Sequence, residues 1–406
     1  MNILQAGLSN NLWIVCHKSS RMKTNMIPNF KSMKRSFLLW LALTASLAAA
    51  PAKSGVTSRP YGQCAEGPVM LHTLVNSNGL SVAVMDYGAT VVSVVTPDRT
   101  GHMDDIALGF DTPDAYAAAA LNFGTMGRYI NRIGGGQITL DGHVYPLTKN
   151  KPPNTMHGGK LGFNRHLWKA EVVSQEPASI KFTRLSPDGE EGFPGNLLVS
   201  VTFTLTNDNR WTVHYEATTD KPTVVNLSNH TLFNLSGPGH GTILDDVVKL
   251  HAGAITPIDA TSVPTGEIKP VDGTPYDLRK PTVIGSRINT LGVKPPGFDI
   301  NYVLSGGGIG NGLSEAGEVY DPHSGRDLQV FTDQPGAQFY TGNLFDGTLV
   351  GKGGVKYTQY CALSIEAQHF PDSPHHANFP STELRPGQNY EANIVYCFSI
   401  RPVPPW

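Results

Sequence analysis

The chain has 406 residues, a formal net charge of −2, and charged side chains at only 16% of its positions. This balance argues against a nucleic-acid-binding protein, which carries a basic excess, and gives no sign of attraction to a membrane surface. The 43 glycines and 30 prolines predict many short elements separated by turns.

The N-terminal segment has the pattern of a secretory signal. Lys34 and Arg35 provide a basic start, residues 37–47 form an apolar run, and small residues follow. This is the order of n-region, h-region and cleavage site. The apolar run is too short for a comfortable membrane span, so we expect no stable membrane insertion once the segment is removed.

We expect translation to start at Met33, because residues 1–32 are polar, patternless and upstream of the signal. Cleavage after Ala52 satisfies the small-x-small rule with Ala50, and cleavage after Ala50 is the alternative. Residues 1–52 are therefore predicted to be a leader, and 53–406 a single domain. The expected location is outside the cytoplasm, in a bacterial periplasm.

Alternating apolar and polar residues predict many strands in the remaining chain. The clearest pattern is a hairpin over residues 197–218 with an Asn-Asp-Asn turn at 207–209. Helical signal is confined to residues 114–122, with Asp114 as a candidate N-cap. The other predicted strands are 80–88, 90–97, 179–186, 247–253, 328–333, 338–343, 361–367 and 390–402. Many strands and little helix predict an all-β sandwich or barrel.

After removal of the leader, the cysteines are Cys64, Cys361 and Cys397. An odd number does not fit a disulfide framework, although one bridge plus one free thiol is compatible with an oxidising compartment. We expect at least one buried free thiol. No Cys-x-x-Cys pair is present, so a structural zinc site is not predicted.

Polar residues interrupt apolar segments at several places. Taken singly, each has an ordinary interpretation: a histidine in an apolar strand is usually a hydrogen-bonded core residue, and an arginine is often an ion-pair partner. Taken together they have chemical logic, because a carboxylate can act as a base, a histidine as an acid, and amide or guanidinium groups can bind hydroxyls. The residues are Arg128, Asn131, Arg132, His157, Asn229, His230, Asp299 and Glu366.

Glu366 ends a short apolar strand and precedes a segment that contains three prolines and three histidines within 14 residues. Pro371 and Pro374 restrict the backbone there, which would hold the carboxylate at a fixed angle. His369, His375 and His376 lack a partner motif for a metal, so no metal is predicted.

Nine segments in order, over about residues 75–390, resemble the aldose 1-epimerase (galactose mutarotase) family. They are GRYINRI, LDGHVYPLTKNKPPNTMHGG, GFNRHLW, EGFPG, VNLSNHTLFNLSG, VPTGEI, GFDINYVL, PGAQFYTGN and EAQHFPDSP…NFPST. The chain departs from the family pattern at Ile300, where a histidine usually follows the aspartate.

The resemblance implies a large single-domain antiparallel β-sandwich, a monosaccharide substrate and no cofactor. It implies that Glu366 is the general base and His230 the general acid of an α/β anomer interconversion. It implies sugar-binding roles for five further residues: Asn131, Arg132, His157, Asp299 and Gln338.

Two alternatives remain at this stage. A hexose-phosphate epimerase of the same fold would need more basic residues for the phosphate than Arg128 and Arg132 provide. A secreted carbohydrate-binding module without turnover would be expected to have lost Glu366 or His230, and both are present.

Overall fold

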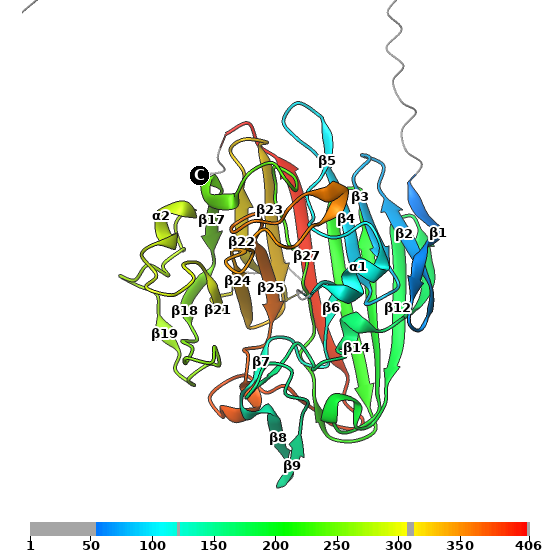
Figure 1. Cartoon of the computed structure of the whole chain (residues 1–406), viewed down its shortest axis with the longest axis vertical. Coiled ribbons are helices and arrows are strands. Elements are labelled where there is room, and N and C mark those ends of the chain that lie inside the picture. The colour runs from blue at the N-terminus through cyan, green and yellow to red at the C-terminus, as the bar shows by residue number, and fades with distance from the viewer. Residues whose placement is uncertain (1–53, 120–121, 307–311, 404–406) are drawn as a thin grey trace, which may run out of the picture. The chain divides into compact units, whose positions relative to one another are not determined.

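Antiparallel strands are the main regular secondary structure of the protein (Figure 1). The computed structural model describes residues 54–119, 122–306 and 312–403, and the predicted leader lies outside them. The described residues belong to one compact unit, Ala49–Trp406. Within those ranges no helix is long and apolar enough to cross a membrane.

Three sheets account for most of the described strands. The large sheet has the order β11 (Lys169–Gln175), β12 (Ala178–Ser186), β13 (Leu197–Leu205), β14 (Arg210–Thr219), β27 (Tyr390–Ile400), β23 (Arg326–Thr332), β22 (Ser314–Tyr320), β17 (Val247–Leu250) and β20 (Thr282–Val283). The N-terminal sheet has the order β1 (Gly55–Cys64), β2 (Gly67–Val75), β3 (Ser81–Met85), β4 (Thr90–Pro97) and β5 (Met103–Asp105). The site sheet has the order β19 (Lys269–Pro270), β18 (Ala252–Ile255), β21 (Asp299–Leu304), β24 (Gly336–Tyr340) and β25 (Ser364–Gln368).

Short two-stranded ladders connect these sheets. They pair β6 (Thr125–Met126) with β16 (Ser228–Asn229), β7 (Arg132–Ile133) with β10 (Thr155–Met156), β8 (Gln137–Leu140) with β9 (His143–Pro146), and β15 (Thr223–Val224) with β26 (Glu383–Leu384). The α-helices of the described ranges are α1 (Pro113–Ala118) and α2 (Gly285–Ile288).

The predicted helix is shorter than expected and has a different N-cap. The Thr112 side chain accepts the N–H of Ala115, and Asp114 lies in the first turn. Asp114 as N-cap is therefore wrong. Thr112 is favoured because the proline at the start of the helix follows it directly, and proline suits the first helical position.

The predicted hairpin at 197–218 is confirmed as β13 and β14, with Leu205 opposite Trp211. Other strands were missed. Most residues of β1 and β11 are exposed or half-buried, so they lack the continuous alternation of a strand with one buried face. Antiparallel pairing with β2 and β12 makes these segments strands, and the sequence pattern does not reveal that pairing.

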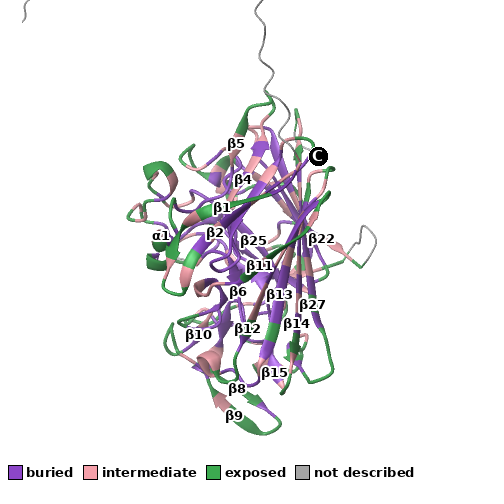
Figure 2. Ribbon diagram, turned by 90° about the vertical axis from the view of Figure 1, so that its right-hand side faces the viewer, coloured by how far each residue is buried: buried purple, intermediate pink, exposed green. Residues whose placement is uncertain are grey.

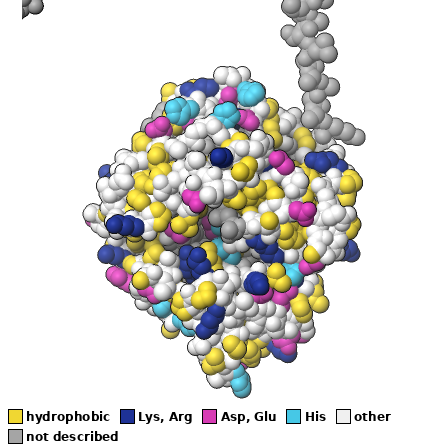
Figure 3. Space-filling view, in the orientation of Figure 1, with side chains coloured by type: hydrophobic (Ala, Val, Ile, Leu, Met, Phe, Trp, Pro, Cys, Tyr) yellow, Lys and Arg dark blue, Asp and Glu magenta, His cyan; other side chains and the backbone are white. Residues whose placement is uncertain are grey.

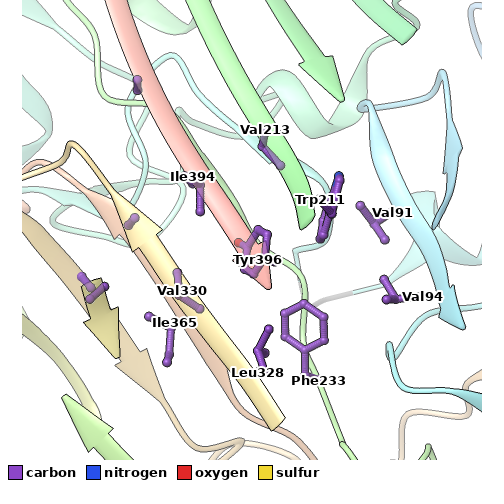
Figure 4. Packing of buried hydrophobic residues seen from close by; sticks show 14 of the residues in the cluster. Val91, Val94, Trp211, Val213, Phe233, Leu328, Val330, Ile365, Ile394 and Tyr396 are labelled. Carbon is purple, nitrogen blue, oxygen red and sulfur yellow. The ribbon is translucent and has the colours of Figure 1, made fainter. Parts of the chain in front are cut away.

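The core lies where the large sheet faces the N-terminal and site sheets, because one buried cluster draws side chains from all three. Figure 4 shows Trp211, Tyr396 and Phe233 between Val94 on one side and Ile365 on the other. Trp211 stacks on Tyr396 with ring centroids 4.6 Å apart. Figure 2 shows buried strands through the interior, whereas the β8–β9 hairpin is largely exposed. The site sheet thus rests on a rigid apolar support.

The cysteines Cys64, Cys361 and Cys397 are free, and Cys361 is buried, which confirms the expected buried thiol. Burial raises the pKa of the Cys361 thiol to about 12 and that of Cys397 to about 11, so both stay protonated near neutral pH.

Protein that lacks residues 1–52 should therefore yield three thiols per chain when titrated in denaturant without reductant. In the folded protein Cys361 should react far more slowly, because it is buried and protonated. A Cys64→Ser variant serves as the control and should yield one thiol fewer. A single thiol in the parent protein would indicate a bridge and contradict the structure.

Candidate active site

The register of the site sheet brings three predicted residues together. Gln338 on β24 lies opposite Glu366 on β25, and Asp299 on β21 lies opposite Tyr340. Because side chains alternate along a strand, Glu366 faces the cleft while its neighbour Ile365 packs into the core (Figure 4). The apolar support therefore fixes the strand that carries the carboxylate.

The β7–β10 ladder brings Arg132 opposite Met156, which places Asn131 beside His157. The main-chain N–H of His157 donates to the Asn131 carbonyl at 2.8 Å. The main-chain N–H of Asn131 donates to the ring Nδ1 of His157 at 3.2 Å. Both residues have positive φ, 62° for Asn131 and 51° for His157. Such conformations are costly for non-glycine residues, and these mutual hydrogen bonds hold them in place.

Gly158, the first glycine of the His-Gly-Gly segment, is required by a close backbone approach. A Cβ atom at Gly158 would lie 1.9 Å from the carbonyl oxygen of Gly127, and its φ is 84°. No other residue type fits this space. The segment is therefore more than an exposed turn, because Gly158 packs against the backbone between β6 and Arg132.

His230 directly follows β16 and lies beside Glu366. Its Nε2 is 3.4 Å from Oε1 of Glu366, and both side chains are nearly fully buried. Its ring packs edge-on against His157, with centroids 5.2 Å apart. The Nδ1 atom of His230 has no hydrogen-bond partner in the part of the chain that the structure describes. A positive charge on this imidazole would therefore be stabilised chiefly by Glu366.

Burial raises the pKa of Glu366 above its ordinary value of 4.5, while the neighbouring His230 and a hydrogen bond from Ser364 lower it. Ser364 Oγ donates to Glu366 Oε1 at 2.8 Å. Oε2 makes no hydrogen bond within the described ranges, so it is the oxygen available to a ligand. Sequence reasoning missed Ser364, although its position two residues before Glu366 on one strand would have placed both on the same face.

The pKa of His157 lies well below its ordinary value of 6.5, because the ring is buried and His230 and Arg132 add positive charge nearby. The imidazole is therefore neutral. Since its Nδ1 accepts the Asn131 N–H, its proton is on Nε2. His157 can thus donate a hydrogen bond to a ligand without acting as a strong acid.

Arg132, Asp299 and Gln338 form a connected polar wall. Gln338 Nε2 donates to Asp299 Oδ1 at 2.6 Å, and the Arg132 guanidinium lies 3.8 Å from Asp299 Oδ2. The Gln338 Oε1 atom is buried without a partner among the described residues. Carboxylate, amide and guanidinium groups together offer both acceptors and donors, which suits a polyhydroxylated ligand.

All seven predicted site residues line one cleft with a volume of about 270 Å³. Figure 3 shows basic, acidic and histidine side chains close together near the centre of this face, over the region where Figure 1 places β25 and β6. The cleft also includes residues that the sequence did not single out: Asn122, Asn150, Lys151, Met156, Tyr340 and Leu344. Tyr340 could have been predicted, because it stands two residues after Gln338 on β24 and therefore on the same face of the strand.

Two sequence candidates lie elsewhere. Arg128 is buried away from the cleft, and its guanidinium donates to the carbonyls of Pro194 and Gly195 at 2.8 and 3.0 Å. It therefore braces a loop and adds no positive charge to the site. Asn229 is also buried, and it accepts the N–H of Thr231 at 3.0 Å, so its role is local.

The histidines that follow Glu366 do not meet at one point in the cleft. His369 Nδ1 pairs with Gln334 Oε1 at 2.8 Å, whereas His375 and His376 both approach Asp372. Among the described residues no group of three or more His, Cys, Asp or Glu side chains could hold a metal ion.

Comparison with known proteins gives the same family across most of the chain. The family model described as aldose 1-epimerase matches residues 70–397. The chain belongs to the aldose 1-epimerase family. Within this family it is 41% identical to galactose mutarotase from Bos taurus over 327 residues, which are 80% of this chain and 93% of that protein.

Bacterial and structural relatives agree. Aldose 1-epimerase from Escherichia coli is 35% identical over 344 residues, covering 84% of this chain and 96% of that protein. An aldose epimerase homologue from C. elegans superimposes with a TM-score of 0.73 at 30% identity, covering 81% of this chain and 98% of the other. Galactose 1-epimerase from Lactobacillus acidophilus superimposes with a TM-score of 0.74 at 27% identity, covering 86% of this chain and 99% of the other. The antiparallel sandwich is therefore the fold of this family.

The residue that departs from the family pattern, Ile300, does not line the cleft. Ile300 is a member of the buried cluster and lies opposite Phe339. Asp299, one residue earlier on β21, points to the other face and lines the cleft. The isoleucine thus packs into the core and leaves the carboxylate in place.

The hydrogen bond from Ser364 favours the charged form of Glu366. A Ser364→Ala substitution should therefore raise the pKa of Glu366 further above 4.5. Carbon NMR titration of protein labelled at the glutamate carboxyl groups measures this, with Glu366→Gln to assign the signal. An unchanged or lower pKa in the alanine variant would contradict the role assigned to this hydrogen bond.

Proposed function

We propose that the protein is an aldose 1-epimerase that interconverts the α and β anomers of aldohexoses such as glucose and galactose. The observation that carries the proposal is the pair of Glu366 and His230, 3.4 Å apart in a cleft lined with hydrogen-bonding groups. The activities named for the bovine and Escherichia coli relatives support it.

The arrangement suits the reaction because the two oxygens involved are bonded to the same carbon. The anomeric hydroxyl must lose a proton while the ring oxygen gains one, and both oxygens are attached to C1. An acid and a base that serve them must therefore lie side by side, as His230 and Glu366 do. A base and an acid placed far apart would not fit.

In the proposed mechanism, Glu366 removes the proton of the C1 hydroxyl and His230 donates a proton to the ring oxygen. The bond between C1 and the ring oxygen breaks, which gives the open-chain aldehyde. Rotation about the C1–C2 bond presents the other face of the carbonyl. The two proton transfers then run in reverse and close the ring as the other anomer, and both side chains return to their initial state.

The other side chains of the cleft bind and orient the sugar. Arg132 is permanently charged and offers a fixed fork of donors, while Asp299 accepts hydrogen bonds from hydroxyls. His157, neutral with its proton on Nε2, adds a donor that does not compete with His230 as an acid. Asn131 and Gln338 complete the set. Holding the sugar in this way lets proton transfer proceed without a search for orientation.

A phosphorylated substrate has less support than a neutral hexose. Arg128 is buried outside the cleft, which leaves Arg132 and Lys151 as the cleft's lysine and arginine side chains within the described ranges. Arg132 already faces Asp299 at 3.8 Å. A phosphate dianion normally takes several strong donors at once.

The pH dependence follows from Glu366. The base must be ionised, and burial raises its pKa above 4.5, so kcat/KM should fall on the acid side at a higher pH than for an exposed glutamate. Glu366 and His230 are in contact, so the two limbs of a bell-shaped profile belong to the coupled pair.

Polarimetry of freshly dissolved α-glucose and α-galactose tests the function. Glu366→Gln and His230→Asn should each lower kcat by at least about 10²-fold, because each removes one proton-transfer group. The double variant should lose far less than the product, since the two residues act as a unit. Arg132→Ala should weaken sugar binding and turnover together.

A wild-type protein that binds the sugar and leaves the spontaneous rate unchanged would identify a binding module. Glu366→Gln with the wild-type rate would refute the assignment of the base. Thermal unfolding of each variant controls for loss of the fold.

We also propose that the chain is exported and that the mature protein works outside the cytoplasm, in a bacterial periplasm. The support is the order of basic, apolar and small residues over 33–52. Protein from the native host should begin near Lys53, as shown by N-terminal sequencing. Leu39→Arg, which interrupts the apolar run, should leave the protein uncleaved in the cytoplasm. A wild-type protein that begins at Met1 would contradict export.

A further inference from the structure

The loop that follows Glu366 is tied to the segment that carries Arg132. Asp372 lies in this loop, with its side chain only 5% exposed and a φ of 58°. Its main-chain N–H donates to the Arg132 carbonyl at 2.9 Å, and its Oδ1 accepts the Gly134 N–H at 2.8 Å. Asp372 thus forms hydrogen bonds with the backbone on both sides of Ile133.

His375 holds the Asp372 carboxylate as well, with its Nδ1 2.6 Å from Oδ1. His376 Nε2 pairs with the Pro264 carbonyl at 3.2 Å and lies 3.3 Å from Asp372 Oδ2. The hydrogen bond with Asp372 raises the pKa of His375, which favours an ion pair. The Asp372 carboxylate is therefore held by Gly134 and His375 together, which fixes its direction toward Gly134.

Arg132 needs this support because its own ladder is short. β7 contains only Arg132 and Ile133, and it pairs with a strand of the same length, β10. Among the described residues, the guanidinium makes one hydrogen bond, to Asn131 Oδ1 at 3.2 Å, and one long contact, with Asp299 at 3.8 Å. The direction of the side chain in the cleft thus depends on how its backbone is held.

We propose that Asp372 is a positioning residue that acts on the sugar through Arg132. It does not line the cleft. The proposal rests on the proposed epimerase function, because its effect appears in how Arg132 binds the sugar hydroxyls. His375 serves Asp372 through its hydrogen bond to the carboxylate, which gives this histidine a role other than metal binding.

A double-mutant cycle on the full mature protein tests this. Asp372→Gly removes the carboxylate without strain, since glycine tolerates the positive φ. It should lower kcat/KM for α-galactose by about tenfold, mostly through KM. In an Arg132→Ala background the same substitution should change kcat/KM by less than about twofold, because the residue it positions is gone.

Asp372→Asn should restore most of the activity, since asparagine keeps an oxygen for the Gly134 N–H and also tolerates positive φ. The matched control is Asp321→Ala. Asp321 is equally buried and accepts the N–H groups of His323 and Ser324 at 2.8 and 3.1 Å, in a turn outside the cleft. It should lower Tm and leave kcat/KM unchanged. If Asp372→Gly does not fold, His375→Ala takes its place in the cycle, because it removes the histidine partner of the Asp372 carboxylate and leaves the backbone at residue 372 unchanged.

The outcomes separate the two hypotheses. A wild-type protein without epimerase activity refutes the proposed function. An active wild-type protein in which Asp372→Gly costs equally in both backgrounds refutes the positioning role alone, because the loss would then be a general effect on the fold. An active protein that Asp372→Gly leaves unchanged refutes it as well.

Discussion

The burial of one carboxylate, that of Glu366, is the constraint on which the site depends. An isolated ionised carboxylate is costly to bury, so the group either takes up a proton or acquires partners. Here it has the Ser364 hydroxyl and the His230 imidazole, with Arg132 adding positive charge nearby. These partners favour the charged form of the buried carboxylate, but they do not lower its pKa to that of a tight ion pair. A carboxylate that is too well stabilised in its charged form does not accept a proton readily.

Satisfying this carboxylate requires segments that are far apart in the chain. Glu366 lies on the site sheet, His230 follows a two-residue strand, and Arg132 lies on another. Such short ladders have little cooperativity of their own, so side-chain contacts to the backbone reinforce them. Asn226 exchanges two hydrogen bonds with the backbone of His369, at 3.0 and 3.1 Å, and the Tyr129 hydroxyl donates to the Phe370 carbonyl at 3.1 Å.

The large sheet contributes rigidity rather than chemistry. Its long strands bury Trp211, Tyr215 and Tyr396 against the back of the site sheet and the N-terminal sheet. Interiors packed to this extent transmit displacement, so the strand of Glu366 cannot shift without disturbing the aromatic cluster behind it. The polar cleft and the apolar core are thus the two faces of the same strand, β25, with Glu366 on one and Ile365 on the other.

The sequence by itself determined the all-β class, the central hairpin and a set of candidate site residues, which the structure brings to one cleft. Alternation with period two is a local property, and the site residues stand in segments that resemble one family in order. Only the tertiary structure decided that Arg128 braces a loop while Arg132 lines the cleft, that Ser364 donates to the Glu366 carboxylate, and that Asp372 donates to the Arg132 carbonyl. The reason is physical. The direction of a side chain in a two-residue strand or a loop is set by partners that are distant in the sequence, and local periodicity carries no information about them.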